Sequence, residues 1–397
     1  MDKWNVARIG DIAEVKGGKR LPKGTTLEAR NNGAPYIRIT DWADGAIDAK
    51  NMMYVPEAAQ PVISRYRIHE DDIFISIVGT IGLTARIGAD LDGSFLTENA
   101  AKITVTNKIM SSTFLRYALM SSAGQNEIHS LAVGSTQPKL ALHRIRDIKV
   151  PCPSREVQVA ISDVLGALDE KIATNTSISR SADQLAGHLF DQAASSVPTI
   201  PMSKVLTPIL GGTPARANPN FWNGERLWAS AKDITGSPFA VLIDSEEKIT
   251  TQAIERTKAK PLPAGSVILT ARGTVGAVAR LAVPSSFNQS CYGFIPNELP
   301  PGLLYFSILR AAQRAKSLAH GSVFDTITMR TFDHLLMPDF GEARVSIESQ
   351  IAPLLDLVTT KVLENASLAA IRDALLPQLM SGKLRVTEAE ALIETVL

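Results

Sequence analysis

The sequence predicts an α+β protein of two tandem domains with a similar fold, related by pseudo-twofold symmetry and separated by two long antiparallel coiled-coil-like helices. Three observations predict this fold class. The 397 residues are enough for two domains. The second half of the chain repeats the first in order and spacing. Each half ends in a stretch of about 37 residues with apolar side chains at helical spacing.

The repeat consists of collinear matches whose offset drifts only slightly. The offset is 190 residues in the helical stretches, 194 in the segments before them and 187 near the end of each globular half. The matching segments are LDEKIATN (168–175) with VTTKVLEN (358–365), IFISIVGTIG (73–82) with VILTARGTVG (267–276), EVKGGKRLP (14–22) with PILGGTPAR (208–216), and SLAVGS (130–135) with SLAHGS (317–322). Because the order is kept throughout, we interpret the chain as a tandem duplication.

Short β-branched segments bounded by Gly, Pro and Asn predict the strands of the two globular halves. These segments are PYIRIT, DIFISIV and KITVT in the first half, and SVILT and GAVARLAV in the second. We expect shorter helices at about 111–132 and 303–319.

The two long helices are predicted at 155–191 and 344–381. Each would span about 55 Å at 1.5 Å per residue, and two matched apolar stripes can bury each other as an antiparallel pair. Pro353 and Pro377 predict a short first turn and a kinked or terminated last turn in the second helix. Asn175 and Asn365 occupy equivalent positions. They either fix the register of the pair or lie on a solvated face.

Composition excludes several classes of protein. Hydrophobic residues make up 45% and charged residues 20% of the chain, which excludes wholesale disorder. The N-terminus has no secretory signal pattern, and no apolar run reaches the roughly 18 residues of a membrane span. Cys152 and Cys291 form no C-x-x-C pair, which argues against a zinc or disulfide framework. We therefore expect a cytoplasmic protein.

Charge differs between the parts of the chain. The two globular stretches, residues 1–150 and 197–340, carry net charges of +3 and +4, whereas each long helical stretch carries −3. A local positive excess favours nucleic-acid binding, because binding releases counterions from phosphates. Ordinary scatter of surface charge is the alternative explanation.

Loops rich in Gly, Lys, Arg and small hydroxyl side chains indicate where contacts with DNA would fall. Arg suits guanine and Gln suits adenine as bidentate partners, and Gly lets backbone approach a phosphate closely. For each loop, a plain turn with solvated charges is the alternative. The candidate DNA-binding residues are Lys19, Arg20, Lys23, Arg38, Arg65, Arg67, Thr80, Gln137 and Lys139 in the first half, and Thr213, Arg216, Lys232, Arg272 and Thr274 in the second.

The motifs that resemble catalytic signatures are incomplete. Asn218-Pro-Asn-Phe lacks the second proline of the Asn-Pro-Pro-aromatic motif of amino-methyltransferases. Gly79-Thr-Ile-Gly and Gly273-Thr-Val-Gly are too short for a dinucleotide fingerprint. The sequence contains no Walker-type phosphate loop, no H-E-x-x-H and no G-x-S-x-G. We therefore expect a binding protein with no catalytic residues, no metal ligands and no cofactor of its own.

The sequence resembles the specificity subunit of type I DNA restriction–modification systems over nearly its whole length. The resemblance rests on the Trp4-x-Val-x-x-Ile-Gly-Asp-Ile start, the Gly-Gly turn at 211–214, the strand and R-G-T-V-G segment at 267–276, SLAVGSTQPKL (130–140), the Val-Pro-x-Pro entry at 150–153, and LLPQLMSGKLRV (375–386). The last stretch is the most specific.

The resemblance implies a domain organisation and a set of partners. It implies target recognition domains at 1–152 and 198–340, a first spacer helix at 153–197, and a second spacer helix with the C-terminal tail at 341–397. Each domain would read one half of a split, asymmetric site in double-stranded DNA. The helices would set the gap and dock methyltransferase subunits, two by this expectation, which restriction–translocase subunits would join. The resemblance places S-adenosylmethionine, ATP and Mg on those partners.

Two other functions stay open at this point. One is the recognition module of a methyltransferase that acts alone, which binding of S-adenosylmethionine to the isolated chain would favour. The other is a structural adaptor whose globular halves bind no nucleic acid. A salt-dependent shift of duplex DNA, measured with the methyltransferase subunit present, would separate the adaptor from a DNA reader.

Overall fold

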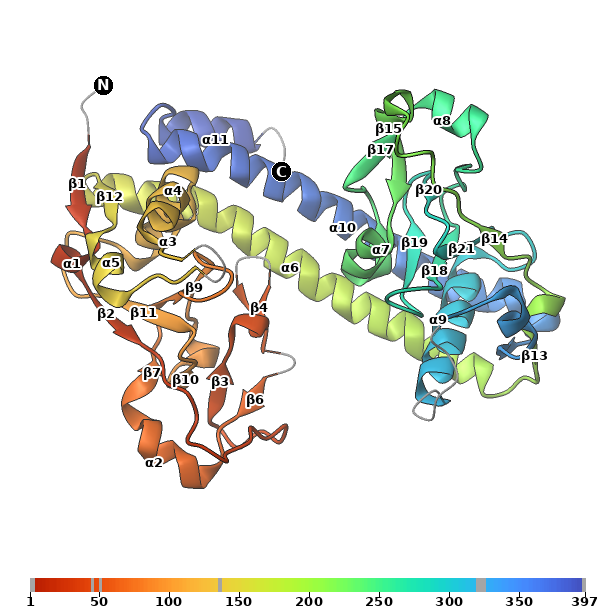
Figure 1. Ribbon diagram of the computed structural model, residues 1–397, viewed down its shortest axis with the longest axis horizontal. Helices are drawn as coiled ribbons and strands as arrows, with labels where there is room; N and C mark the ends of the chain where they lie inside the picture. The colour runs from red at the N-terminus through yellow and green to blue at the C-terminus, as the bar shows by residue number, and fades with distance from the viewer. Residues whose placement is uncertain (1–3, 44–45, 50–51, 135–137, 319–325, 395–397) are drawn as a thin grey trace. The chain divides into compact units, whose positions relative to one another are not determined.

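The computed structural model describes residues 4–43, 46–49, 52–134, 138–318 and 326–394 (Figure 1). The chain forms two compact units. Unit 1 comprises Met1–Glu170 with Ala369–Leu397, and unit 2 comprises Lys171–Leu368. Each unit combines an α+β part with segments of two long helices, α6 (Arg155–Ala194) and α10 (Arg344–Met380). The predicted fold class, two similar α+β halves with paired long helices, is confirmed.

Unit 1 contains two four-stranded sheets. The first has the order β2 (Ala13–Gly17), β11 (Ala100–Val105), β8 (Ile73–Ser76), β9 (Thr84–Arg86). The second has the order β6 (Met53–Tyr54), β3 (Pro35–Ile37), β10 (Ser94–Leu96), β7 (Arg67–Ile68), with β3 and β10 parallel. Other strands and helices are β1 (Asn5–Arg8) paired with β12 (Lys149–Cys152), β4 (Trp42–Ala43) paired with β5 (Ala46–Ile47), α1 (Ile9–Ile12), α2 (Gln60–Ile63), α3 (Ser112–Met120), α4 (Ser122–Leu131), α5 (Leu142–Asp147) and α11 (Val386–Glu394).

Unit 2 has the same plan. Its first sheet has the order β14 (Ile209–Leu210), β21 (Cys291–Phe294), β18 (Val267–Thr270), β19 (Val278–Leu281), β16 (Val241–Leu242). Its second has the order β17 (Glu247–Ile249), β15 (Trp222–Ala229), β20 (Ser286–Phe287), with β15 and β20 parallel. Its other elements include β13 (Thr199–Pro201) paired with β22 (Leu336–Pro338), α7 (Ala231–Gly236), α8 (Thr251–Arg256) and α9 (Pro301–Leu318).

Strand register confirms the duplication at the level of single residues. Ile75 pairs with Thr84 in unit 1, and Leu269 pairs with Val278 in unit 2, so both members of the pair are shifted by 194 residues. The long helices belong to the hydrophobic cores. In unit 2, Phe190 of α6 lies in one buried cluster with apolar residues of α9, α10 and the first sheet.

Helices α6 and α10 pack together as an antiparallel pair (Figure 1). In unit 2, Asn175 Nδ2 donates a hydrogen bond to Asn365 Oδ1 over 3.0 Å. Farther along α6, Ala182 packs in one cluster with Val358 and Val362 of α10, so residue numbers rise on one helix as they fall on the other. Asn175 is only 1% exposed. The asparagine contact thus joins the two helices, with Asn175 buried and Asn365 half-buried, so the solvated-face alternative is wrong and a role in register is favoured.

The expectation of a short first turn at Pro353 in α10 needs correction, whereas the helix does end within one turn of Pro377. The helix runs without interruption through Pro353 and Pro377, from Arg344 to Met380. An interior proline removes one backbone hydrogen bond, at a cost of about 3 kcal/mol. Burial of neighbouring side chains such as Leu355 and Leu376 offsets that cost.

Each long helix has a side chain, at equivalent positions in α6 and α10, that caps the start of a shorter helix. Gln158 Oε1 accepts from the amide of Ser111 at the start of α3 over 2.8 Å. Glu348, 190 residues later, accepts from the amides of Gly302 and Leu303 at the start of α9 over 2.8 and 2.9 Å. The first amides of a helix lack intrahelical partners, so both side chains satisfy groups that would otherwise be unpaired.

Replacing Gln158 by glutamate should destabilise unit 1 in a pH-dependent way. Gln158 is fully buried, and its Nε2 donates to the carbonyls of Ile109 and Pro153 over 2.8 and 2.9 Å. A carboxylate would face those carbonyls without a proton to donate, so we expect Q158E to lower the free energy of unfolding by about 2–3 kcal/mol at pH 7. Burial would raise the pKa of the new carboxyl, as it raises the pKa of Glu348.

The pH dependence follows from that direction. With a raised folded-state pKa, the folded state holds the proton more tightly, so stability falls as pH rises above the ordinary Glu value of about 4.3. Urea unfolding of Q158E between pH 4 and pH 8, compared with E348Q as the reciprocal exchange, measures this loss. A Q158E curve parallel to that of the unaltered protein would contradict the capping role.

Candidate nucleic-acid interface

In unit 1, the connection from β10 to β11 brings several predicted loops together. Residues 96–100 exchange backbone hydrogen bonds with the Gly-Gly loop, with β3 and with the loop that follows β8. From amide donor to carbonyl acceptor, these bonds are Lys19 to Leu96 (2.8 Å), Gly18 to Ala100 (3.0 Å), Thr97 to Ile37 (3.1 Å) and Ile77 to Asn99 (2.8 Å). The loops carrying Lys19, Arg20 and Thr80 therefore meet at one short segment, which we call connection 1.

In unit 2, residues 287–291 occupy the equivalent place, and we call them connection 2. The corresponding bonds are Gly212 to Phe287 (2.9 Å), Gly211 to Cys291 (3.1 Å), Asn288 to Ala229 (3.0 Å) and Ala271 to Ser290 (2.8 Å). Each bond of connection 1 thus has a counterpart. Two polypeptide segments with different sequences adopt one backbone scaffold.

The scaffold shifts the sequence match of the Gly-Gly loops by one residue. The hydrogen bonds make Gly18, not Gly17, the equivalent of Gly211, so the offset here is 193 and not 194. A Cβ atom on Gly18 would lie 2.0 Å from the carbonyl oxygen of Thr97, and one on Gly211 would lie 2.1 Å from that of Asn288. Glycine is required because the two backbones approach more closely than any side chain allows.

The loops after β8 and β18 are held in the same way. Ser76 Oγ donates to the carbonyl of Thr80 over 2.6 Å and accepts from the amide of Leu83 over 2.9 Å. Thr270 Oγ1 makes the same two bonds, to Thr274 and from Ala277. A buried hydroxyl thus fixes each tight loop while the side chains of its tip stay exposed.

Those exposed tips carry predicted site residues. Thr80 lies on the tip in unit 1, and Lys139 lies beside it because residue 139 forms a β-bridge with Val78. Arg272 and Thr274 lie on the tip in unit 2. Gln137, also predicted, lies outside the described residues.

Side chains around connection 1 form a basic group. Arg20 Nε lies 2.6 Å from Glu98 Oε1, and Lys19 Nζ lies 5.8 Å from the ring centre of Tyr66. Arg65 precedes Tyr66, and both it and Lys23 are exposed. Partial burial would raise the pKa of Glu98, but Arg20 overcomes this effect and holds that pKa below its ordinary value. Glu98 therefore stays ionised and orients Arg20.

Two further candidates in unit 1 are engaged within the fold. Arg38 forms a two-point ion pair with the buried Asp41, with its Nη2 2.5 Å from Oδ1 and its Nε 3.0 Å from Oδ2. The guanidinium of Arg67 lies 4.0 Å from the ring centre of Phe95 and donates to the carbonyl of Gly93. Both guanidinium groups hold local structure, which lowers their availability to a ligand.

Connection 2 is surrounded by different side chains. Thr213 Oγ1 donates to Gln289 Oε1. Arg216 pairs with Glu247, and its guanidinium lies 3.9 Å from the ring centre of Trp222. Lys232, on α7, lies 2.7 Å from Glu246 on an exposed surface. Hydrogen bonding to Glu247 raises the pKa of Arg216, which stays charged.

Sequence reasoning missed four side chains of this surface. Glu98 and Gln289 were passed over because an acidic residue and an isolated Gln give no basic signal. Lys258 and Lys260 are exposed, and the backbone of Lys258 packs against Gly212. The K-A-K spacing of these two lysines was the available signal.

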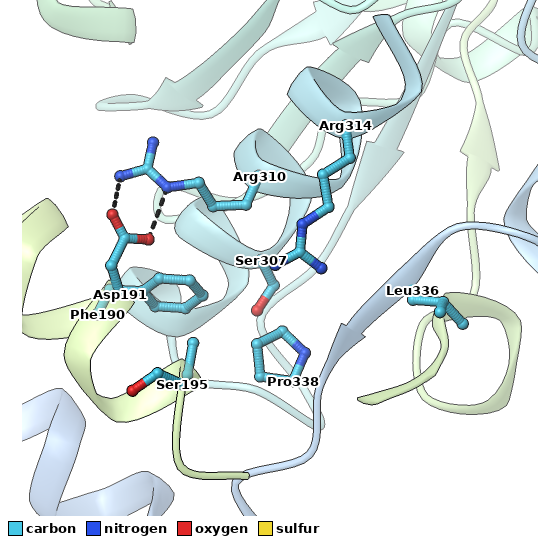
Figure 2. A pocket seen from close by; sticks show the side chains of 9 residues that line it. Phe190, Asp191, Ser195, Ser307, Arg310, Arg314, Leu336 and Pro338 are labelled. Atoms are coloured by element: carbon cyan, nitrogen blue, oxygen red, sulfur yellow. Dashed lines mark hydrogen bonds and ion pairs between the residues drawn. The ribbon is translucent and has the colours of Figure 1, made fainter. Parts of the chain in front are cut away.

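A cavity elsewhere in unit 2 is too small for a drug-sized ligand. It measures about 210 Å³ and lies between the C-terminal end of α6, α9 and β22, whereas sites for such ligands span roughly 300–1,000 Å³. Figure 2 shows that Asp191 faces Arg310, and their two hydrogen bonds are both 2.8 Å long. The carboxylate that lines this cavity thus binds one of the two arginines that line it.

In the ranges that the structure describes, no three His, Cys, Asp or Glu side chains gather as a metal site would need. No helix among those residues has the length and hydropathy to cross a membrane.

These features define a class of duplicated proteins. Such a protein has two α+β halves, each of which presents basic side chains on a shared backbone scaffold, and a pair of long helices. The model of the type I restriction modification DNA specificity domain matches residues 1–182 and 209–338. Because these matches cover most of the chain, the protein belongs to the family of type I restriction–modification specificity proteins.

Similar proteins agree with this assignment. The chain is 24% identical to the type I restriction enzyme MjaIX specificity subunit of Methanocaldococcus jannaschii, with 97% of this chain and 94% of that protein aligned. It is 20% identical to the HindI specificity subunit of Haemophilus influenzae, over 97% and 100% of the two chains. The crystal structure of a type I S subunit from M. genitalium has a TM-score of 0.58 at 16% identity, covering 95% of this chain and 96% of that one. That likeness shows a shared fold.

Proposed function

We propose that this chain is the sequence-reading subunit of a type I restriction–modification complex, and that each unit reads one half of a bipartite, asymmetric DNA site. One observation carries the proposal: connections 1 and 2 share a backbone scaffold but present different side chains. A duplicated scaffold with diverged side chains is the arrangement expected of two readers of different sequences. Base edges in the major groove offer distinct donor and acceptor patterns to such side chains.

The long helices would set the gap between half-sites and dock methyltransferase subunits. Helix α6 has 40 residues, so it is about 60 Å long, which exceeds the roughly 34 Å turn of B-DNA. Several large apolar side chains of the helices are exposed and suit a protein partner. They include Ile178, Leu185, Leu357 and Leu363. We place catalysis, S-adenosylmethionine, ATP and Mg on the methyltransferase and restriction–translocase partners.

Genome-wide mapping of methylated adenines, with this chain co-expressed with its methyltransferase subunit, tests the proposal. We expect one asymmetric motif with two fixed halves and an unspecified gap. Exchanging residues 1–152 for the equivalent domain of another family member should change one half only. A single contiguous motif, or a change in both halves, would contradict modular reading.

Lengthening both long helices by one turn should change the gap and leave the half-sites unchanged. Four residues inserted after Glu170, together with four inserted before Ala369, add about 6 Å, or roughly two base pairs at 3.4 Å each. The same mapping measures the gap, and four residues inserted at the exposed Asn31 serve as the control. An unchanged gap in the double insertion would count against the helices as a spacer.

A further inference from the structure

We propose that residues 20 and 98 in unit 1 and residues 213 and 289 in unit 2 are equivalent base-reading positions, with Arg20 presenting a guanidinium to guanine and Gln289 presenting a carboxamide to adenine. The inference rests on the proposed function, because it names the side chains by which each unit reads DNA.

The two pairs are equivalent by position. Arg20 and Thr213 are 193 residues apart, as are Gly18 and Gly211 beside them. Glu98 and Gln289 are 191 residues apart, as are the carbonyl acceptors that flank them. In each unit, a side chain on the Gly-Gly loop bonds a side chain on the connection. An ion pair in unit 1 thus takes the place of a neutral hydrogen bond in unit 2.

Both pairs are exposed on fixed backbone. The Arg20 side chain is 80% exposed and the Glu98 side chain is 29% exposed. Gln289 is likewise exposed. Backbone hydrogen bonds hold the residues on either side of each pair, so the side chains start from a rigid base. A reader needs this combination, because rigid support lowers the entropy lost when a ligand binds.

Hydrogen-bond chemistry assigns a base to each pair. The bond of Arg20 to Glu98 uses Nε, and the two terminal nitrogens carry the donors that match guanine O6 and N7. In unit 2 the hydroxyl of Thr213 fixes Oε1 of Gln289. The Gln289 amide keeps two N–H donors and a second acceptor site on Oε1. Adenine needs a donor for its N7 and an acceptor for its N6 amino group, and the Gln289 amide can supply both.

A reciprocal exchange tests this assignment. R20T/E98Q gives unit 1 the pair of unit 2, and T213R/Q289E gives unit 2 the pair of unit 1. Each variant is co-expressed with the methyltransferase subunit, and methylated adenines are mapped across the genome. We expect discrimination at one position of one half-site to change about tenfold or more, with loss of guanine in the first variant and gain of guanine in the second.

The matched control is R8T/D147Q. Arg8 and Asp147 also form an exposed pair in unit 1, 3.7 Å apart, but Arg8 is the last residue of β1 and Asp147 the last residue of α5. This variant should leave both half-sites unchanged. If it changes the motif as R20T/E98Q does, the effect is not specific to the connection.

The outcomes separate the inference from the proposed function. A bipartite motif in the unaltered chain that neither exchange alters would overturn the inference and leave the proposed function standing. Absence of any bipartite motif in the unaltered chain would overturn the proposed function. If R20T/E98Q abolishes methylation, the R20K variant tests the assignment of Arg20 to guanine instead. Lysine keeps the positive charge but cannot donate two parallel hydrogen bonds, so the assignment requires that R20K discriminate less strongly in favour of guanine. An unchanged preference for guanine in R20K would overturn the assignment.

Discussion

Replacement of Asp169 by alanine is expected to lower the free energy of unfolding by about 3–5 kcal/mol, as removing one partner of a buried ion pair does. Asp169 lies on α6, and its side chain is only 22% exposed. Its carboxylate receives hydrogen bonds from Arg116 Nη1 (3.0 Å), Tyr117 Oη (2.7 Å) and Arg372 Nη1 (2.9 Å). One side chain thereby ties α3 to α6 and α10 in unit 1, and its loss leaves a phenol and two guanidinium groups without this acceptor.

Urea unfolding of D169A, compared with D163A, measures the effect. Asp163 lies on the same helix and is exposed, so D163A should change stability by less than about 0.5 kcal/mol. Burial would raise the pKa of Asp169, but Arg116, Arg372 and Tyr117 outweigh burial and hold it below the ordinary value of 3.8.

The sign of the pH dependence follows from the lowered pKa. The unfolded state binds the proton more tightly, so the stabilisation by Asp169 is present at neutral pH. It is lost as pH falls below about 3.8, through the lowered pKa of the folded state. The difference between D163A and D169A should therefore shrink at low pH. A D169A protein as stable as D163A at pH 7 would show that the three bonds contribute little.

The sequence alone was enough to predict the parts of the fold that depend on local patterns. Helical spacing of apolar residues placed the long helices to within a few residues of α6 and α10, because one continuous stripe has few alternative solutions. The internal repeat predicted that both halves share a fold, which the strand registers confirm. Asn175 and Asn365 were identified as equivalents, but the burial of Asn175 depended on how the helices pair.

The organisation of the candidate site depends on contacts that the sequence does not reveal. Glu98 is 78 residues from Arg20, and Gln289 is 76 residues from Thr213. No periodic pattern links such residues, because the pairing depends on how β10 and β20 lead into the next strand. The one-residue shift of the Gly-Gly match has the same origin. Sequence identity alone aligns Gly17 with Gly211, whereas the backbone hydrogen bonds make Gly18 the equivalent of Gly211.

Replacement of Gly18 by alanine is expected to abolish reading of the half-site assigned to unit 1, and Gly211→Ala should do the same for unit 2. The new Cβ would lie 2.0 Å from Thr97 O in unit 1 and 2.1 Å from Asn288 O in unit 2. Both contacts are with backbone, so no side-chain rotation relieves them. The loop and the connection must separate, which breaks their two amide–carbonyl bonds and costs about 3 kcal/mol or more.

The matched control is Gly166→Ala. Gly166 lies within α6, and nothing lies within 4 Å of a Cβ built on it. Alanine favours a helix over glycine, so this variant should be more stable by about 0.5–1 kcal/mol and should recognise the same DNA. Urea unfolding measures the stability of all three proteins, and adenine-methylation mapping measures their recognition.

The two glycine variants also test whether the two units read their half-sites independently of each other. Because Gly18 and Gly211 support separate connections, Gly18→Ala should leave the half-site assigned to unit 2 as an isolated preference, detectable as weak binding of duplex DNA that carries only that half. Gly211→Ala should show the converse. A contradicting result would be equal loss of recognition of both half-sites in either variant, at a stability close to that of Gly166→Ala. The two connections would then act as one reader, and the duplicated scaffold would not divide the site between them.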